Sequence, residues 1–435
     1  MISEVDMTGT RKHAKALLAL FLAAAMLLAG CGREEGIKPS VEEISGISRA
    51  AGFIAAKAEE SGGFISGTDQ RDKASDYAYL YDNATAAVLL ASVGAQAHAE
   101  ILVDAIVFAQ THDRTFRDGR LRNTYISGNP QSDSGRSIAS GKVTIRIPGF
   151  WQNGRWQEDA YTVSTSTGNM AWTILALCST AKNASEEKRT EYLEAAVRAA
   201  DFVLTLKSEN GGFNAGYEGW DDAQTRLTYQ STEHNIDLYA AFTALSDTLS
   251  ETDPTKAAEY RSAADYAKAF VFSMYDPDAH CFYTGTEKNG KTVSDVVIPL
   301  DTNSLAVLAL GTELEDPAST LAFVEERMAV DEGYDFSAGD LDGIWNEGTA
   351  QMAVCYYQLG NRERYDALMS YLRTQTNDNG SIPAADRDSV STGFVIAGSD
   401  SVWAYNNALS ISATTWLAFA QLGRNPFDRS VWQAA

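Results

Sequence analysis

The stretch Ser-Thr-Glu-His-Asn-Ile-Asp-Leu-Tyr-Ala-Ala-Phe at residues 231–242 shows the pattern that decides the fold. A short polar cluster opens an apolar, Ala-rich run that is about 15 residues long, the length of a buried helix. Five more clusters open similar runs, at residues 81–83, 166–169, 301–303, 345–349 and 406–412. A helix that is apolar on nearly all sides is buried on nearly all sides. The sequence therefore predicts six buried inner helices.

Between these runs lie charge-rich segments with amphipathic spacing, such as residues 185–207, 255–274 and 361–376. Their pattern is typical of helices with one face in water. The alternation predicts an all-α fold, an (α/α)6 toroid of twelve helices in six hairpins. In such a repeat the starts of the inner helices share one end of the barrel. We expect a ligand pocket at that end.

The beginning of the chain has the pattern of an export signal. Arg11, Lys12 and Lys15 precede an apolar stretch, residues 16–28, that is too short to span a bilayer comfortably. Leu-Ala-Gly-Cys, ending at Cys31, resembles the lipobox of bacterial lipoproteins. The resemblance implies cleavage before this cysteine and attachment of diacylglycerol to its sulfur.

The expected organisation has three parts. Residues 1–30 are a lipoprotein signal peptide, and residues 31–40, which are small and charged, are a lipidated tether. Residues 41–435 form a single toroid domain, because no Pro-, Gly- or Ser-rich break divides them. We therefore expect a protein anchored to the cell membrane by lipid, on the extracytoplasmic face.

Composition restricts the partners. The chain carries 58 acidic and 35 basic residues, a formal charge of −23, which argues against nucleic acid and favours a neutral ligand. Cys178 and Cys355 lie inside apolar runs, where a thiol acts as a small hydrophobic group. There is no Cys-x-x-Cys pair, and neither a disulfide framework, a metal site nor a cofactor is predicted.

Aromatic and polar side chains near the inner-helix starts indicate a sugar site. Sugars have flat C–H faces that stack on aromatic rings, although such rings can also simply cover the ends of a barrel. The predicted substrate-binding residues are Trp151, Trp220, Tyr229 and Trp345, with the polar side chains Asp82, Asn169, His234 and Asn235.

One long loop, residues 113–165, is rich in arginine in an otherwise acidic protein. Its seven arginines are Arg114, Arg117, Arg120, Arg122, Arg136, Arg146 and Arg155. Guanidinium groups bind carboxylate or phosphate bidentately, so the loop could hold a uronate or a phosphate over the pocket. The alternative is that most of them are solvated or paired with the abundant acids.

Four inner-helix starts carry carboxyl groups: Asp82, Glu233, Asp301 and Glu347. Glycosidic bond cleavage needs two, one protonated to assist the leaving group and one ionised. We expect Glu233 to be the general acid and Glu347 or Asp301 to be the base. The alternative is structural, because Asp is a favoured N-cap and Glu in the first turn interacts well with the helix dipole.

Three segments, residues 231–242, 345–353 and 415–427, resemble bacterial proteins of the six-hairpin glycosidase-like superfamily. The phrase around Glu233 resembles a subgroup of lipoproteins without an assigned reaction. The likeness covers residues 77–427. It implies an (α/α)6 toroid with a ligand site at the inner-helix ends and, for many members, carbohydrate hydrolysis or lysis.

The sequence thus predicts a surface-anchored glycoside hydrolase acting on a carbohydrate. The first alternative is a non-catalytic glycan-binding lipoprotein that keeps the aromatic rings. The second is a polysaccharide lyase for uronate polymers, built from His234, Asn235, Tyr229 and the arginine loop. An epimerase that works with two pocket histidines is disfavoured, because His234 is the only histidine near one of the polar clusters.

Overall fold

The chain is mainly helical, as expected. A computed structural model describes residues 39–67, 76–133, 135–396 and 400–432. Among these residues there are fourteen α-helices, two short 3-10 helices and only short strands. Twelve of the α-helices correspond to the alternating inner and outer segments. The sequence pattern did not predict the other two, α2 (Val41–Ile47) and α6 (Ala160–Val163), which are short additions.

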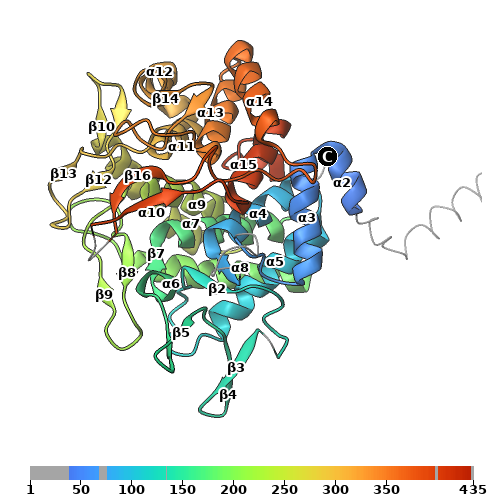
Figure 1. The fold of residues 1–435 in the computed structure, drawn as a ribbon. Coiled ribbons are helices and arrows are strands. Elements are labelled where there is room, and N and C mark those ends of the chain that lie inside the picture. Colours follow the sequence, from blue (N-terminus) through green and yellow to red (C-terminus); the bar gives the residue numbers. More distant parts are fainter. Residues whose placement is uncertain (1–38, 68–75, 134, 397–399, 433–435) are drawn as a thin grey trace, which may run out of the picture. The chain divides into compact units, whose positions relative to one another are not determined.

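Six helices are buried along nearly their whole length, and each begins within or next to one of the six polar clusters. They are α4 (Leu80–Ser92), α7 (Thr167–Ala181), α9 (Thr232–Leu249), α11 (Leu300–Leu310), α13 (Asn346–Gln358) and α15 (Ile411–Leu422). Each packs against the next in chain order, and α15 packs against α4. The six inner helices therefore form a closed ring (Figure 1).

Six amphipathic helices pack outside the ring. They are α3 (Arg49–Ser61), α5 (Gln96–Thr111), α8 (Glu186–Leu204), α10 (Pro254–Ser273), α12 (Pro317–Met328) and α14 (Arg362–Gln375). Five of them pair with the inner helix that precedes them, whereas α3, near the start of the described chain, pairs with α15 near its end (Figure 1). The helices α3 and α15, from opposite ends of the described chain, thus form the sixth pair of outer and inner helices.

A repeated hydrogen bond ties each inner helix to the loop before it. In all six helices the fourth residue accepts a backbone N–H from that loop. The acceptors are Asn83, Met170, Asn235, Asn303, Thr349 and Thr414, and the donors are Ile65, Leu121, Phe213, Phe282, Tyr334 and Ile382. Because the same position is used each time, the six hairpins share one register.

The loops carry short antiparallel strands. Two-stranded pairs are β1 (Tyr77–Tyr79) with β2 (Thr124–Ile126), β3 (Arg136–Ala139) with β4 (Lys142–Ile145), β5 (Phe150–Gln152) with β6 (Arg155–Gln157), β10 (Tyr275–Asp276) with β11 (Cys281–Phe282), β12 (Gly285–Thr286) with β13 (Val293–Ser294), β14 (Ala329–Val330) with β15 (Gly333–Tyr334), and β16 (Val390–Val395) with β17 (Val402–Tyr405). The strands β7 (Thr165–Ser166), β8 (Gly216–Glu218) and β9 (Thr225–Arg226) form the one three-stranded sheet of the described chain.

Residues 40–435 form one compact unit. The predicted signal peptide, the lipidated Cys31 and nearly all of the tether lie outside the described residues. None of the helices in the described part of the chain combines the length and the apolar character that a membrane crossing requires.

Candidate active site

Three carboxyl groups occupy equivalent positions in the ring. Glu233, Asp301 and Glu347 are each the second residue of an inner helix, in α9, α11 and α13, which are consecutive in the ring. Asp82 is the third residue of α4, next to Tyr81 at the second position. The repeat therefore brings the acids predicted from the sequence to the same end of the ring.

None of the four acids is the N-cap of its helix. The N-cap residues are Tyr79, Ser231, Pro299 and Trp345. In α9 the Ser231 hydroxyl caps the helix by accepting the His234 N–H at 3.2 Å, which leaves the Glu233 carboxyl free of that role. Of the two structural roles considered for these acids, capping is therefore excluded, and interaction with the helix dipole remains.

Glu347 is held by side chains from other helices. The Tyr81 hydroxyl donates to Glu347 Oε1 at 2.8 Å, and the Trp416 indole N–H donates to the Tyr81 oxygen at 3.0 Å. Burial raises the pKa of Glu347, whereas Ser412, Tyr81 and Gln351 lower it by hydrogen bonding. Side chains from α4, α13 and α15 therefore meet around Glu347.

The carboxyl groups influence one another's ionisation. Burial raises the pKa of Glu233 well above its usual range, and the charges of Asp301, Asp237 and Glu347 raise it further. Burial and the charge of Glu347 raise the pKa of Asp301 to about 7 and also raise that of Asp82. Burial and mutual repulsion thus favour protonation within this cluster, whereas hydrogen bonds favour the ionised form of Glu347.

Asp237 is a fifth acid of this cluster that the sequence reasoning missed. It lies one helical turn below Glu233 on α9 and is fully buried. The Trp172 indole lies beside this carboxyl group and opposes the rise in pKa that burial causes. Burial, with the charge of Asp301, raises its pKa well above the usual range. The i, i+4 spacing from Glu233 was the available signal.

These raised pKa values predict that the protein is more stable in mild acid than in mild base. Carboxyl pKa values are about 4 in an unfolded chain, so between pH 4 and 7 these carboxyls bind more protons in the folded state and their contribution to stability falls as pH rises. The single His234, with its lowered pKa, acts in the opposite direction. We expect a higher thermal midpoint at pH 5.5 than at pH 8. In Asp301→Asn this difference should shrink, whereas the exposed control Asp366→Asn should keep it. A midpoint that is higher at pH 8 than at pH 5.5 would contradict the prediction.

Two aromatic residues that the sequence analysis did not select, Tyr405 and Tyr161, lie near the acids, and a third, Trp403, contacts Tyr161. Tyr405 of β17 has its pKa raised by burial and by the charges of Glu347, Asp301 and Glu233, so it lies near all three. Tyr161 of α6 is 45% exposed, but the protein around its hydroxyl, with the charges of Asp82 and Glu233, raises its pKa to about 12. The Tyr161 ring contacts that of Trp403, at 5.8 Å between ring centres. These rings belong to loop segments far apart in the sequence.

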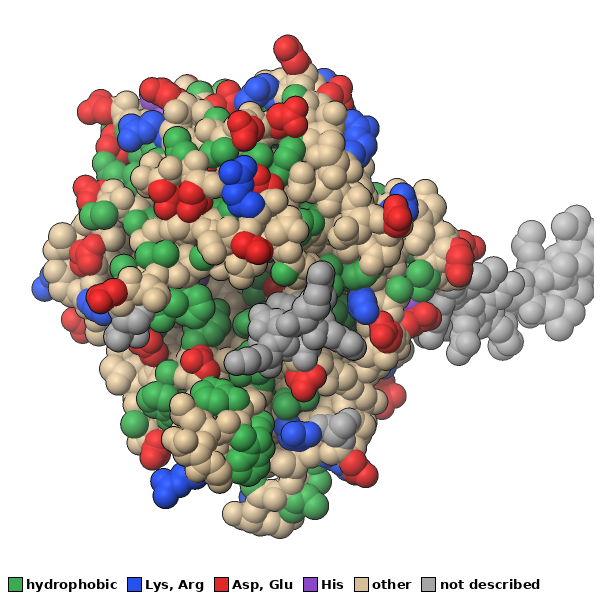
Figure 2. All heavy atoms as spheres, in the orientation of Figure 1, with side chains coloured by type: hydrophobic (Ala, Val, Ile, Leu, Met, Phe, Trp, Pro, Cys, Tyr) green, Lys and Arg blue, Asp and Glu red, His purple; other side chains and the backbone are tan. Residues whose placement is uncertain are grey.

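Two of the four predicted aromatic residues are exposed and two are not. Trp151 is 72% exposed and Trp220 is 51% exposed. Tyr229 is half-buried, with its pKa raised by burial and by Glu218 and Glu233. Hydrophobic side chains gather around the middle of the face shown in Figure 2. Trp345, in contrast, is buried and stacks on the Tyr405 ring, with 5.4 Å between ring centres. It therefore helps to fix the position of the Tyr405 ring.

The polar residues predicted to bind substrate differ in their surroundings. The Asn169 amide donates to Asn123 at 2.9 Å. His234 lies against the start of α7, with its ring nitrogens 3.4 Å from the Ser166 hydroxyl and 3.2 Å from that of Thr167. Burial lowers the pKa of His234 to about 4, so the ring is neutral at pH 7.

Asn235 uses its side-chain amide within the protein. Its Oδ1 accepts the Phe213 N–H at 2.8 Å, and its Nδ2 donates to the carbonyls of Phe213 and Ser231 at 3.1 and 2.8 Å. It is fully buried. Asn235 is therefore one of the six residues that tie an inner helix to the loop before it. The structure gives no support for its predicted role in substrate binding.

Asn235→Ala is expected to lower the free energy of unfolding by about 2 to 4 kcal/mol, because it leaves a buried N–H and carbonyl unpaired. Asn169→Ala, which removes a single hydrogen bond of a half-buried side chain, should cost less. Urea unfolding of both variants measures the difference. Equal stability of the two variants would show that the hydrogen bonds between Asn235 and the loop contribute little to stability.

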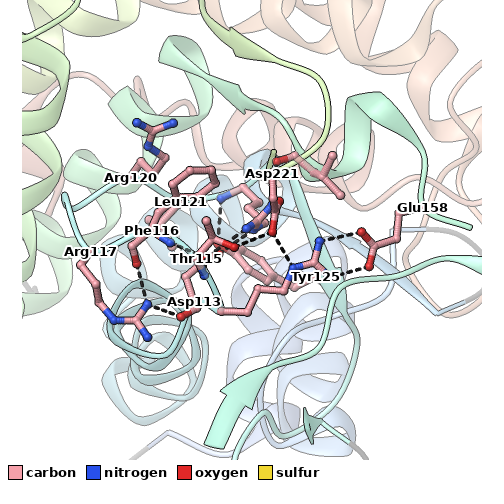
Figure 3. A network of polar contacts seen from close by, with 12 residues as sticks. Asp113, Thr115, Phe116, Arg117, Arg120, Leu121, Tyr125, Glu158 and Asp221 are labelled. Atoms are coloured by element: carbon pink, nitrogen blue, oxygen red, sulfur yellow. Dashed lines mark hydrogen bonds and ion pairs between the residues drawn. The ribbon is translucent and has the colours of Figure 1, made fainter. Parts of the chain in front are cut away.

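Most arginines of the long loop pair with acids. Arg122 is fully buried and contacts Asp113 at 2.6 Å and Asp221 at 2.5 Å, and Arg114 contacts Asp221 and Glu158 at 2.7 and 2.6 Å (Figure 3). We call these five residues the arginine network. Arg120 and Arg136 pair with Asp118 and Asp133, and Arg117 donates to backbone carbonyls. The alternative of pairing with acids is confirmed for Arg114, Arg120, Arg122 and Arg136.

The arginine network fixes loops at the rim of the site. It joins the segment after α5 to the segments before α6 and after β8. The Glu158 carbonyl also accepts the Trp220 indole N–H at 2.9 Å. The network thus holds Trp220 in place and lies close in the chain to Tyr161.

No known protein-family profile matches the chain, and neither does any curated protein. Solved structures do match. A glycosidase variant in complex with glucose aligns with a TM-score of 0.59 at 13% identity, covering 88% of this chain and 98% of that one. An α-amylase from Clostridium perfringens aligns with a TM-score of 0.56 at 11% identity, covering 89% and 99%. A sugar epimerase from a ruminal bacterium aligns with a TM-score of 0.57 at 11% identity, covering 87% and 98%. At these identities the likeness establishes a shared fold.

Proposed function

We propose that the protein is an (α/α)6 toroid that acts as a glycoside hydrolase, with Glu233 as the general acid and Glu347 as the base. One observation carries the proposal: Glu233, Asp301 and Glu347 take the same position on three consecutive inner helices and influence one another's ionisation. Glycosidic bond cleavage needs two such carboxyls with different protonation states.

The environments of the two glutamates support these roles. Among the described residues no hydrogen-bond donor contacts Glu233, and burial with neighbouring charge favours its protonated form, as an acid requires. Glu347 accepts the Tyr81 O–H, and its charge raises the pKa of Asp82, Glu233 and Asp301. The hydrogen bonds to Glu347 favour its ionised form against the effect of burial, as a base requires.

Asp301 is the second candidate for the base. Its Oδ1 accepts the Thr302 N–H at 2.7 Å, which favours the ionised form, but burial and Glu347 hold its pKa near 7. In Asp301→Asn we would expect residual hydrolysis if Glu347 is the base, and none if Asp301 is.

Exposed rings would hold the sugar above the acids. Trp151, Trp220 and Trp403 are about half exposed or more, and Tyr161 and Tyr405 lie near the carboxyl groups. Stacking of sugar faces on such rings, with a few polar contacts, is typical of ligand sites of this kind. Asp82, Asn169, His234 and Tyr229 are the proposed polar contacts.

A lipid on Cys31 would place this activity at the cell membrane, on the extracytoplasmic face. The proposal rests on the Leu-Ala-Gly-Cys sequence alone. Metabolic labelling with a radioactive fatty acid tests it, because the label should be lost in Cys31→Ala.

The other candidate functions use the same rings. A glycan-capture protein would need the aromatic residues without the carboxyls. A uronate lyase would need free cations, whereas Arg114, Arg120, Arg122 and Arg136 are already paired with acids. A sugar epimerase shares the fold, but the single histidine of the site, His234, has a lowered pKa.

Product analysis distinguishes these functions. The full chain, solubilised in a mild detergent, is incubated with a panel of neutral and uronate-containing oligosaccharides. New saturated reducing ends indicate a hydrolase, an absorbing unsaturated product indicates a lyase, and an isomeric sugar of unchanged mass indicates an epimerase or isomerase. Binding without any product indicates capture. We expect the first outcome.

A further inference from the structure

We infer that Tyr81 is the positioning residue for the base: its hydroxyl proton is directed at Glu347 Oε1 because an indole N–H occupies the hydroxyl oxygen from the other side. The inference rests on the proposed function, since it assigns a task to Glu347. Tyr81 does not itself act on the sugar in this account. It keeps the Glu347 carboxylate ionised and holds it in a fixed orientation.

The direction of the two hydrogen bonds follows from their chemistry. The Trp416 indole N–H can only donate, so at 3.0 Å it uses a lone pair of the Tyr81 oxygen. The single hydroxyl proton of Tyr81 is then available to the partner at 2.8 Å, Glu347 Oε1. Glu347 must accept at that oxygen, and a hydrogen bond to the ionised form favours ionisation.

Packing fixes the position of Trp416, whose indole N–H donates to Tyr81. Trp416 is fully buried and meets Trp172 edge-on at 6.1 Å between ring centres and Phe419 at 5.6 Å. The Tyr81 ring also meets Trp172 edge-on, at 5.7 Å. Rings held on several sides have little rotational freedom, so the two hydrogen bonds from Trp416 through Tyr81 to Glu347 are already formed before substrate binds.

Burial raises the pKa of Glu347, and other acidic groups lie around it. Carboxyls face it from three helices, Asp82 from α4, Glu233 from α9 and Asp301 from α11, and the Tyr405 phenol faces it from β17. The neighbouring helix α15 contributes only neutral groups, a hydroxyl and an indole. An anionic neighbour would disfavour ionisation of Glu347, so donors such as Tyr81 are needed to keep it charged.

Tyr81→Phe tests the inference, because it keeps the ring and removes the O–H. Hydrolysis of an oligosaccharide should lose about tenfold to a hundredfold in kcat, the effect expected for one hydrogen bond to a charged group, with KM little changed. The acidic limb of the pH profile of kcat/KM should move to higher pH by about one to two units, since the pKa of Glu347 rises when a donor is lost.

Two further variants complete the design. Tyr260→Phe is the matched control, because Tyr260 donates to the Asp201 carboxylate at 2.8 Å on the outer layer and should leave the pH profile unchanged. Trp416→Phe removes the N–H that orients the hydroxyl and should move the acidic limb in the same direction, by less. An unchanged limb in Tyr81→Phe would overturn the inference, and so would a raised KM at constant kcat.

An infrared titration keeps this test separate from that of the proposed function. The carboxylate band of Glu347, identified by its loss in Glu347→Gln, should titrate at higher pH in Tyr81→Phe than in the unmodified chain. This readout needs no turnover. A chain that hydrolyses nothing overturns the proposed function, whereas an unshifted band overturns the role of Tyr81.

Discussion

Replacing Glu233 by glutamine is expected to lower kcat for a natural oligosaccharide by about a hundred- to ten-thousand-fold, the range expected for loss of a general acid. The amide keeps the size of the side chain but has no proton to give to the departing oxygen. A sugar linked to a good leaving group, such as a nitrophenol, departs without this proton. The variant should therefore retain much more of its activity on such an aryl glycoside.

Two controls make this result specific. Glu251→Gln changes an exposed glutamate outside the ring and should leave both rates unchanged. Thermal unfolding of Glu233→Gln should show a midpoint no lower than that of the unmodified chain, because Ser231 and not Glu233 caps α9. Equal losses on both substrates would assign Glu233 a role other than that of the acid.

Replacing Arg122 by alanine is expected to lower the free energy of unfolding by about 3 to 5 kcal/mol, the cost of breaking a buried ion pair from one side. Arg122 is fully buried, and Asp113 beside it is 2% exposed. The guanidinium holds the pKa of Asp113 below its usual range, against the effect of burial. Without it the carboxylate must take up a proton or draw in water.

Urea unfolding of three variants tests this expectation. Arg136→Ala breaks an exposed pair with Asp133 and should cost less than about 1 kcal/mol. The double variant Arg122→Met with Asp113→Leu removes both buried charges and should recover much of the loss. If Arg122→Ala costs no more than Arg136→Ala, the arginine network does not stabilise the rim.

Much of the scaffold could be predicted, because helix periodicity and helix starts are local properties. The segment expected at residues 361–376 is α14 (Arg362–Gln375), and the one expected at residues 255–274 is α10 (Pro254–Ser273). The repeat also placed Glu233, Asp301 and Glu347 at one end of the ring. Equivalent positions in a repeat share one environment, so their convergence needed no knowledge of contacts.

The remaining features depend on contacts between distant segments. Tyr405 reaches the acids only because β17 pairs with β16 across a loop, and Arg122 meets Asp221 across 99 residues. No local pattern indicates either contact. Asn235 shows a different limit: its place at a helix start was clear, but the direction of its amide, toward the loop, depends on tertiary packing.

One measurement tests the central claim most directly: binding and cleavage of the same oligosaccharide by the full chain and by Glu233→Gln. Calorimetric titration gives the affinity, and release of reducing sugar gives the rate. The account predicts cleavage by the unmodified chain, and in the variant an affinity close to that of the unmodified chain with cleavage almost abolished. Binding by both proteins with cleavage by neither would contradict it, and would assign the ring of carboxyls and aromatic residues to glycan capture.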